Sequence, residues 1–340
     1  MALTLKDVAK DLGLSIVTVS KVLRNHSDVS AKTRKRVLKR IEELDYHRNP
    51  MARGLVTGRS YTVGLVVPDL LHPWYAEIAK GLCRLLRKQD YGVLISSSEE
   101  DPKLEREGIE HLLSRRVDAL IVASSQTTVE SFRRIEGQKT PYVLIDRKFA
   151  GLEANFVGVD DELIGQMATE HLIDCGRRRI AHIRGPQVST AAGRLDGYRS
   201  ALIRRGLAVF PGYIVGGRQG DEAGEARGCE AMQQLLRTDP PPDAVFCYND
   251  PVAIGAMQAI WEAGLRIPQD IAVIGCGNVR YGTFLRVPLS SIDQNSAQLG
   301  VKAAQLTLRL MESAPARPKT VVLQPKLVIR ASTQEPDGER

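Results

Sequence analysis

The chain has 340 residues and a formal net charge of +7. That length favours a small module joined to a two-lobed domain over a single domain. Residues 1–60 contain 13 of the 47 Lys and Arg but only 6 of the 40 Asp and Glu, so the entire excess of positive charge lies there. A basic segment on a neutral body is typical of nucleic-acid-binding proteins. An anionic membrane is the competing partner, but no apolar run approaches the ~20 residues of a membrane span, so we expect no membrane partner.

Cysteine usage and the N-terminus bear on the cellular compartment. The five cysteines are odd in number and scattered, and no pair has metal-ligand or CxxC spacing: Cys83, Cys175, Cys229, Cys247 and Cys276. We interpret them as reduced thiols of the core. Because no signal peptide precedes the first charged helix, we expect a cytoplasmic protein that holds no metal or other cofactor.

Residues 4–23 read as two short helices joined by a turn at Gly13. Thr4 and Ser15 stand where N-caps belong, each ahead of apolar residues with helical spacing. Those residues are Val8, Ala9 and Leu12, then Val19, Val22 and Leu23. The face of the second helix without core residues carries Ile16, Val17, Ser20 and Lys21. In a DNA-binding helix-turn-helix this face enters the major groove. The alternative is a plain amphipathic hairpin.

A third helix is predicted from Ser30 onward. Its inward positions are Val37, Leu38, Ile41 and Leu44, and its outward positions are Lys35, Arg36, Lys39 and Arg40. The basic face is either a solvated surface or a set of phosphate contacts. Next to a helix-turn-helix we favour phosphate contacts, which position a protein on DNA without reading its sequence.

Residues 49–60 predict a very short helix or an ordinary linker. Asn49 can cap it, Pro50 suits the first helical position, and Gly58 ends it. A helix of two turns is marginal alone in water, so only a partner helix or DNA would order it. Leu55 has no nearby apolar run to join. We therefore consider it a candidate wedge that enters the minor groove and kinks the duplex.

From residue 61 onward, apolar strands alternate with helices. The predicted strands are 61–67, 92–97, 118–123, 142–146, 156–159, 180–184, 213–216, 244–247 and 271–275. The predicted helices include 76–86, 104–113, 193–205, 222–236 and 251–263. Continuous Val, Ile and Leu runs between helices indicate parallel sheets covered on both faces. The number of strands favours an α/β fold of two consecutive doubly wound lobes, and residues 290–292 and 321–329 are expected to cross between them.

Polar and aromatic side chains gather directly after the predicted strands. They are His72, Trp74, Tyr75, Asp146, Arg147, Ser189, Thr190, Arg194, Arg218, Gln219, Asn249, Asp250 and Gln294. Ligands of open α/β sheets collect at these strand ends. Aromatic rings and forked polar groups suit a small polyhydroxylated molecule. Each residue also has a structural alternative: Trp74 in the core, Asp146–Arg147 as an ion pair, Asn249 as a helix cap.

No catalytic grouping is convincing. GxSxG, HExxH and GxxxxGK[ST] are absent. The segment 275–280 follows a strand but has Arg280 where GxGxxG requires its third glycine, which makes it a weak dinucleotide signal. We therefore expect no enzyme activity.

The sequence resembles the LacI–GalR family of bacterial transcription repressors over nearly its whole length. The motifs that carry the resemblance are TLKDVAKDLGLSIVTVSKVL, VSAKTRKRVLKRIEELDY and NPMARGL. The resemblance implies that Ile16, Val17 and Lys21 read bases, that Thr18, Ser20 and Thr33 contact phosphates, and that Leu55 is the hinge-helix leucine. The full set expected at the DNA is Thr4, Ser15, Ile16, Val17, Thr18, Ser20, Lys21, Thr33, Asn49, Met51, Ala52, Arg53 and Leu55.

The remainder resembles a type I periplasmic sugar-binding-protein core. The resemblance implies an effector site made of His72, Trp74, Tyr75, Asp146, Arg147, Ser189, Thr190, Arg194, Gln219, Asn249 and Gln294. Two positions depart from the family pattern: His72 replaces a common asparagine, and Gly277 replaces an aspartate that grips hydroxyls. The loop at 187–193 is also one residue short. With several cations near the cleft and one carboxylate missing, we favour an acidic or phosphorylated sugar over a neutral one.

These observations predict a domain order. Residues 1–48 form the DNA-binding domain, 49–60 the hinge, and 61–330 the two-lobed domain, followed by a polar, frayed tail at 331–340. The N-lobe is expected at about 61–160 plus 292–320, and the C-lobe at about 161–291 plus 321–330. The family's C-terminal leucine heptads are missing, so we expect a homodimer on a pseudo-palindromic double-stranded operator. The alternatives are an NAD-type α/β enzyme and a free sugar-binding protein. The first would need a dinucleotide fingerprint and the second an export signal, and this sequence shows neither.

Overall fold

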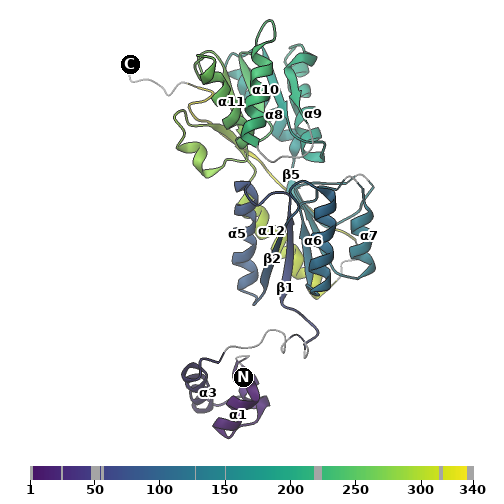
Figure 1. Ribbon diagram of the computed structural model, residues 1–340, viewed down its shortest axis with the longest axis vertical. Helices are drawn as coiled ribbons and strands as arrows, with labels where there is room; N and C mark the ends of the chain where they lie inside the picture. The colour runs from purple at the N-terminus through teal and green to yellow at the C-terminus, as the bar shows by residue number, and fades with distance from the viewer. Residues whose placement is uncertain are drawn as a thin grey trace. The chain divides into compact units, whose positions relative to one another are not determined.

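A computed structural model describes residues 3–23, 26–46, 54, 57–126, 128–149, 151–217, 224–313 and 317–334. The chain forms two separate units, residues 1–60 and residues 61–340 (Figure 1). Within the described residues, no helix is both long and apolar enough to cross a lipid bilayer.

The first unit contains three helices, α1 (Leu5–Leu12), α2 (Ile16–Leu23) and α3 (Ala31–Glu43). Thr4 and Asp7 form a capping box at the start of α1, and Gly13 ends that helix with φ +63°, a conformation that glycine adopts without strain. The hydroxyl of Ser15 accepts from the Thr18 amide at the start of α2. The buried core consists of Val8, Ala9, Leu12, Val19, Val22 and Val37. These contacts build the predicted helix-turn-helix.

One predicted core position of this unit is wrong. Leu38 is 47% exposed, whereas Ile41 and Leu44 only pack against the edge of the core. Val37 takes the inward position on α3, and the next residue points ~100° away around the helix. Two short partner helices cannot cover that second direction, so Leu38 lies in an open groove beside Arg34 and Lys35.

The second unit contains two six-stranded sheets. The first has the order β11-β5-β4-β3-β1-β2 and the second β12-β10-β9-β8-β6-β7. Neighbouring strands are parallel except β12, which runs antiparallel to β10. The strands are β1 (Thr62–Val67), β2 (Gly92–Ser97), β3 (Ala119–Val122), β4 (Tyr142–Ile145), β5 (Phe156–Val159), β6 (Ile180–Arg184), β7 (Ile214–Gly216), β8 (Ala244–Cys247), β9 (Ala272–Cys276), β10 (Ser290–Asp293), β11 (Thr320–Leu323) and β12 (Lys326–Val328).

Helices cover both faces of each sheet (Figure 1). The helices are α5 (Pro73–Arg87), α6 (Pro102–Ser114), α7 (Glu130–Gly137), α8 (Asp161–Asp174), α9 (Ser189–Arg204), α10 (Gly224–Leu236), α11 (Asp250–Glu262) and α12 (Ser296–Glu312). In the first lobe α5 and α12 pack on one face and α6 and α7 on the other; in the second lobe α8 and α9 oppose α10 and α11. This confirms the predicted pair of doubly wound lobes.

The chain crosses between the lobes at slightly different points from those predicted. Residues 290–293 form β10, which pairs with β9 of the second sheet, although 292–293 were expected in the N-lobe. Residues 320–323 form β11, which pairs with β5 of the first sheet, although 321–323 were expected in the C-lobe. The sequence pattern shows that these segments are apolar but not which sheet edge each one extends.

Residues 332 and 333 do not belong to the polar, frayed tail that was expected at 331–340. Ser332 and Thr333 are buried. The Ser332 hydroxyl donates to the Val273 carbonyl at 2.6 Å and accepts from the Ser290 amide at 2.8 Å. Ser332 was expected in a solvated tail because it is small and polar. In the structure it completes the hydrogen bonding of two buried strands, β9 and β10.

Glycines bring the paired helices of each lobe into close contact. Gly81 and Gly300 lie where α5 crosses α12, Gly165 and Gly197 where α8 crosses α9, and Gly228 and Gly255 where α10 crosses α11. At each of the six positions a methyl group would overlap a backbone oxygen of the partner helix. Because glycine has no side chain, the two helices of each pair can approach more closely at these positions than any other residue would allow.

Acid is expected to weaken the second lobe through His182. This residue of β6 is fully buried between Phe246 and Tyr198, and burial lowers its pKa from 6.5 to about 4. The unfolded chain then binds the proton more tightly, so stability falls as pH drops from 6.5 to 4. We expect the free energy of unfolding to lose about 3 kcal/mol more between pH 7 and pH 4 in the native chain than in His182→Phe. Urea unfolding at both pH values measures this, and parallel losses in the two chains would contradict it.

Candidate functional site

A cavity lies between the two lobes of the second unit. Its lining consists of Asp69, His72, Trp74, Tyr75, Glu100, Asp146, Arg147, Pro186, Arg194, Tyr248, Asn249, Cys276 and Gln294. Its volume is about 40 Å³, which holds a few water molecules. Ligand sites are several times larger. In this structure the cavity is therefore too small for a sugar-sized molecule.

The cavity contains eight of the eleven residues predicted for an effector site. Seven of them follow the carboxyl end of a strand or begin the next helix, as in other open α/β sheets, and Arg194 lies in the second turn of α9. Trp74 and Asn249 have both of the roles considered from the sequence. Trp74 is buried in the first lobe and lines the cavity, and Asn249 caps α11 by accepting from the Val252 amide at 2.9 Å.

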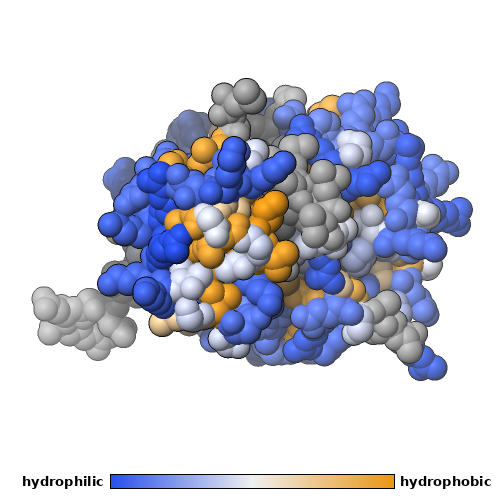
Figure 2. Space-filling model, turned by 90° about the horizontal axis from the view of Figure 1, so that it is seen from below, coloured by the Kyte–Doolittle hydropathy of each residue, from blue (hydrophilic) through white to orange (hydrophobic). Residues whose placement is uncertain are grey.

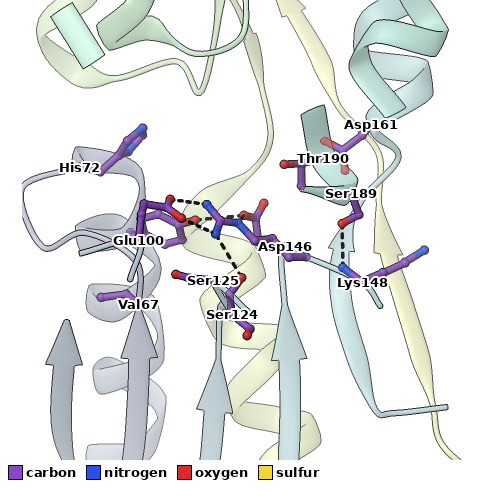
Figure 3. Close-up of polar contacts among 12 residues, drawn as sticks. Val67, His72, Glu100, Ser124, Ser125, Asp146, Lys148, Asp161, Ser189 and Thr190 are labelled. Carbon is purple, nitrogen blue, oxygen red and sulfur yellow. Dashed lines mark hydrogen bonds and ion pairs between the residues drawn. The ribbon is translucent and has the colours of Figure 1, made fainter. Parts of the chain in front are cut away.

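Two predicted residues do not line the cavity. The Ser189 hydroxyl accepts from the Lys148 amide at 2.9 Å, which links the second lobe to the first (Figure 3). The Thr190 hydroxyl pairs with the Tyr248 hydroxyl at 2.8 Å. The predicted Arg218 and Gln219 lie outside the described residues.

Five lining residues were not predicted: Asp69, Glu100, Pro186, Tyr248 and Cys276. Asp69 lies two residues after β1, and Tyr248 directly follows β8. Ligand sites of open α/β sheets are built from residues that follow the strands, and this applies to Asp69 and Tyr248 as much as to His72 and Asn249. Applying it to every residue after β1 and β8 would have predicted both. Glu100 follows β2, an end from which no candidate was taken.

Arg147 forms a double ion pair with Glu100. Nη1 donates to Glu100 Oε2 at 2.8 Å and to the Ser124 carbonyl at 3.1 Å, while Nη2 donates to Glu100 Oε1 (Figure 3). The guanidinium Nε lies 3.7 Å from Asp146 Oδ2, which accepts from the Tyr75 hydroxyl at 3.0 Å. Arg147 is buried. Two carboxylates of the first lobe, Glu100 and Asp146, therefore flank its charge, although Nε has no hydrogen-bond partner among the described residues.

Arg194 is the corresponding cation of the second lobe. Its Nε donates to Asp161 Oδ1 at 3.0 Å and its Nη1 to the Tyr248 carbonyl at 2.7 Å. The guanidinium also lies 4.6 Å from the centre of the Tyr248 ring. A buried guanidinium held by a carboxylate, a carbonyl and an aromatic face is fixed in position.

His72 and Asn249 face each other across the lobes. Asn249 Nδ2 lies 3.2 Å from His72 Nε2, and the Trp74 amide donates to His72 Nδ1 at 3.3 Å. Burial lowers the pKa of His72 to about 4, so the ring is neutral at pH 7. A neutral imidazole can accept only one of these two hydrogen bonds. A ligand oxygen between His72 and Asn249 would satisfy both groups.

Gly277 adopts φ +126°, which other residues rarely tolerate. A Cβ there would lie 3.6 Å from Asp250 Oδ2 and 3.9 Å from the Trp74 ring. Asp250 accepts from the Ser291 hydroxyl and the Val279 amide, each at 2.7 Å, while burial raises its pKa to about 6. Asp250 therefore holds the segment after β9 in place. Because both of its oxygens already accept hydrogen bonds from the protein, Asp250 does not take the ligand-binding role of the aspartate that Gly277 replaces.

The first unit presents the predicted reading face. On α2, Val17 is 62% exposed and Ile16 is exposed beside it. Lys21 forms an exposed ion pair with Asp28. Ser30 caps α3 by accepting from the Thr33 amide at 3.2 Å, and the two hydroxyls lie 2.9 Å apart. Ser20 also lies on α2. The predicted Asn49, Met51, Ala52, Arg53 and Leu55 lie outside the described residues.

Neither unit offers a metal site in the part of the chain that is described, where no three His, Cys, Asp or Glu residues gather as ligands. The same part contains the five cysteines as free thiols, Cys247 and Cys276 buried and the others partly exposed.

Comparison with known proteins covers both units. Residues 4–49 match the family described as bacterial regulatory proteins, lacI family, and residues 169–333 match the periplasmic binding protein-like domain. The catabolite control protein A of Priestia megaterium is 32% identical over 98% of this chain and 100% of its own. The ribose operon repressor of Escherichia coli (strain K12) is 34% identical over 97% and 99%. The solved lac repressor dimer bound to operator and the anti-inducer ONPF has a TM-score of 0.83 at 28% identity, covering 98% of this chain and 99% of that one.

Proposed function

The chain belongs to the LacI family of bacterial regulatory proteins, and from this we propose that it is a DNA-binding repressor controlled by a small, sugar-like effector held between its lobes. It acts in the cytoplasm. The relatives are a catabolite control protein and operon repressors, and membership in this family sets aside the dehydrogenase and the free sugar-binding protein.

The observation that carries the proposal is the exposed apolar pair on α2. Ile16 and Val17 lie outside the core although they are large and hydrophobic. Apolar side chains of this kind match thymine methyl groups in the major groove. Most of the surface in Figure 2 is hydrophilic, with hydrophobic residues gathered in patches among hydrophilic ones. The surrounding charge supplies the attraction to phosphates.

Effector control follows from the small size of the cavity. A sugar-sized ligand requires a spacing of the lobes different from the one in this structure. It changes DNA affinity only by its different affinities for these two states. The hinge predicted from the sequence at 49–60 is where this difference would reach the DNA, with Leu55 as the minor-groove wedge.

A homodimer is the proposed assembly. The edge strand β2 exposes Leu94 and Ile95, and Leu71 near the end of β1 is 89% exposed. An apolar edge strand is normally covered in a native protein. A two-fold partner at this edge would cover it and would present two heads to a pseudo-palindromic operator.

The proposed function is tested by a mobility-shift assay. We expect salt-sensitive binding to DNA beside the protein's own coding region, in excess over random duplex of the same length. A set of monosaccharides added one at a time should include one that changes this affinity. The absence of any preference among duplexes, with and without these sugars, would overturn the proposal.

Lys21 is expected to determine the preference at one base pair. Its ion pair with Asp28 is exposed and therefore weak, so the ammonium group is available to a guanine. Lys21→Ala should reduce discrimination at that base pair by ~1–3 kcal/mol. As a matched control, Lys39→Ala on the basic face of α3 should weaken binding to all sequences alike. Binding to a panel of single-base operator variants separates the two results, and identical profiles for both variants would contradict the assignment.

A further inference from the structure

Glu100 occupies Arg147 in the way that an anionic ligand would. A carboxylate or phosphate is normally held by two parallel N–H···O bonds from a guanidinium fork. Here both Nη atoms already donate to the two oxygens of Glu100, and Nη1 also donates to Ser124. The Nη1/Nη2 edge of the fork is therefore filled, while Nε, which donates no hydrogen bond among the described residues, faces a second carboxylate, Asp146 Oδ2, at 3.7 Å.

The loop that carries Glu100 is held in place at a backbone cost. Glu99 and Glu100 have φ +50° and +57°, a region that residues with side chains occupy rarely and with strain. The Glu100 amide donates to the Pro68 carbonyl at 3.2 Å, and the Asp101 amide to the Ser98 carbonyl at 2.7 Å. Ser98 itself is buried. Consecutive strained residues anchored on both sides are typical of segments that place one side chain at a site.

The charges around the cavity point in the same direction. Among the described lining residues, the carboxylates are Asp69, Glu100 and Asp146, and the guanidiniums are Arg147 and Arg194. Arg194 is paired with Asp161 outside the lining. His72 is neutral at pH 7. A ligand with a negative charge would therefore meet more carboxylates than free cations.

We propose that Glu100 is the residue that selects the charge of the effector: by neutralising Arg147 it makes the cavity accept an uncharged polyhydroxylated molecule and reject sugar acids and sugar phosphates. This rests on the proposed function, since it specifies the class of effector for the same site. It reverses the preference for an acidic or phosphorylated sugar that the number of arginines suggested from the sequence.

The experiment follows thermal unfolding of the full chain against inorganic phosphate at constant ionic strength. The variant is Glu100→Gln, which keeps the shape of the side chain and removes its charge. The matched control is Glu99→Gln, an exposed neighbour in the same loop with the same charge change. Adding Arg147→Gln to Glu100→Gln shows whether any phosphate binds at Arg147 rather than at the basic head, which all variants share.

We expect saturable stabilisation of Glu100→Gln at phosphate concentrations about tenfold or more below any that affects the native chain or Glu99→Gln. Adding Arg147→Gln should abolish the gain. The proposal is overturned if Glu100→Gln gains no phosphate binding, or if the native chain already binds phosphate in a way that Arg147→Gln removes.

A second measurement uses the native chain alone, in case Glu100→Gln does not fold. Glucose, galactose and ribose are compared with glucuronate, galacturonate and ribose 5-phosphate by the same method. Stabilisation by neutral sugars only supports the proposal, and stabilisation by an acid or phosphate ester above its neutral counterpart overturns it. If no sugar binds but Glu100→Gln gains phosphate, the sugar-like effector of the proposed function fails while the role of Glu100 stands.

Discussion

Gly255→Ala is expected to destabilise the second lobe, although alanine favours helices. Gly255 lies on α11, and a methyl group there would overlap the backbone oxygen of Glu225 on α10. A backbone atom cannot rotate away as a flexible side chain can, so the two helices must separate. Separation would disturb the core that α10 and α11 share with the second sheet. We expect a net loss of about 3 kcal/mol in the free energy of unfolding, against a gain of about 1 kcal/mol from helix propensity.

Gly137→Ala is the matched control for this substitution. Gly137 is the last residue of α7, and a methyl group there would meet nothing within 4 Å. The same chemical change should leave stability within about 1 kcal/mol of the native value. Urea unfolding followed by circular dichroism measures both variants. Equal stabilities for Gly255→Ala and Gly137→Ala would show that α10 and α11 are not as close as described.

The glycine pairs also explain what periodicity can and cannot predict. The helices and strands of both lobes follow from their apolar patterns, because buried parallel strands are continuous runs of Val, Ile and Leu. The pairing of helices does not follow, since the crossing points are occupied by glycines such as Gly165 and Gly197, which contribute nothing to a hydrophobic pattern. Ser332 was missed for the same reason: its burial depends on backbone groups of distant strands.

The residues that line the cavity could be predicted from the sequence where their position follows from the order of the strands and helices. Parallel strands end at the same edge of a sheet, so residues after different strands meet whatever their distance in the sequence. Glu100 was not predicted because no candidate was taken from the end of β2, although Glu100 lies three residues after that strand. Only its left-handed backbone turns it towards Arg147. The number of charged residues near a site can be predicted from the sequence. Which of them form ion pairs depends on local backbone geometry of this kind.

Arg194→Met is expected to destabilise the second lobe by ~3–5 kcal/mol, because it leaves the partner of a buried charge alone. Asp161 is 15% exposed at the side chain and pairs with Arg194 at 3.0 Å. The Tyr248 carbonyl would lose its donor as well. Asp161→Asn in the same chain removes the orphaned charge, so the double variant should be more stable than Arg194→Met. A double-mutant cycle from urea unfolding gives the coupling energy of the pair.

Arg204 and Glu170 provide a control on the same two helices. They form an ion pair of 3.1 Å between α9 and α8, but their side chains are 51% and 40% exposed. Water screens such a pair, so its coupling energy should be about 0–1 kcal/mol. Burial is the main difference between the two pairs, since the helices and the charges are alike. If both cycles return the same small coupling, the Arg194–Asp161 pair is solvated in solution, and the cavity then lies open to water even without a ligand.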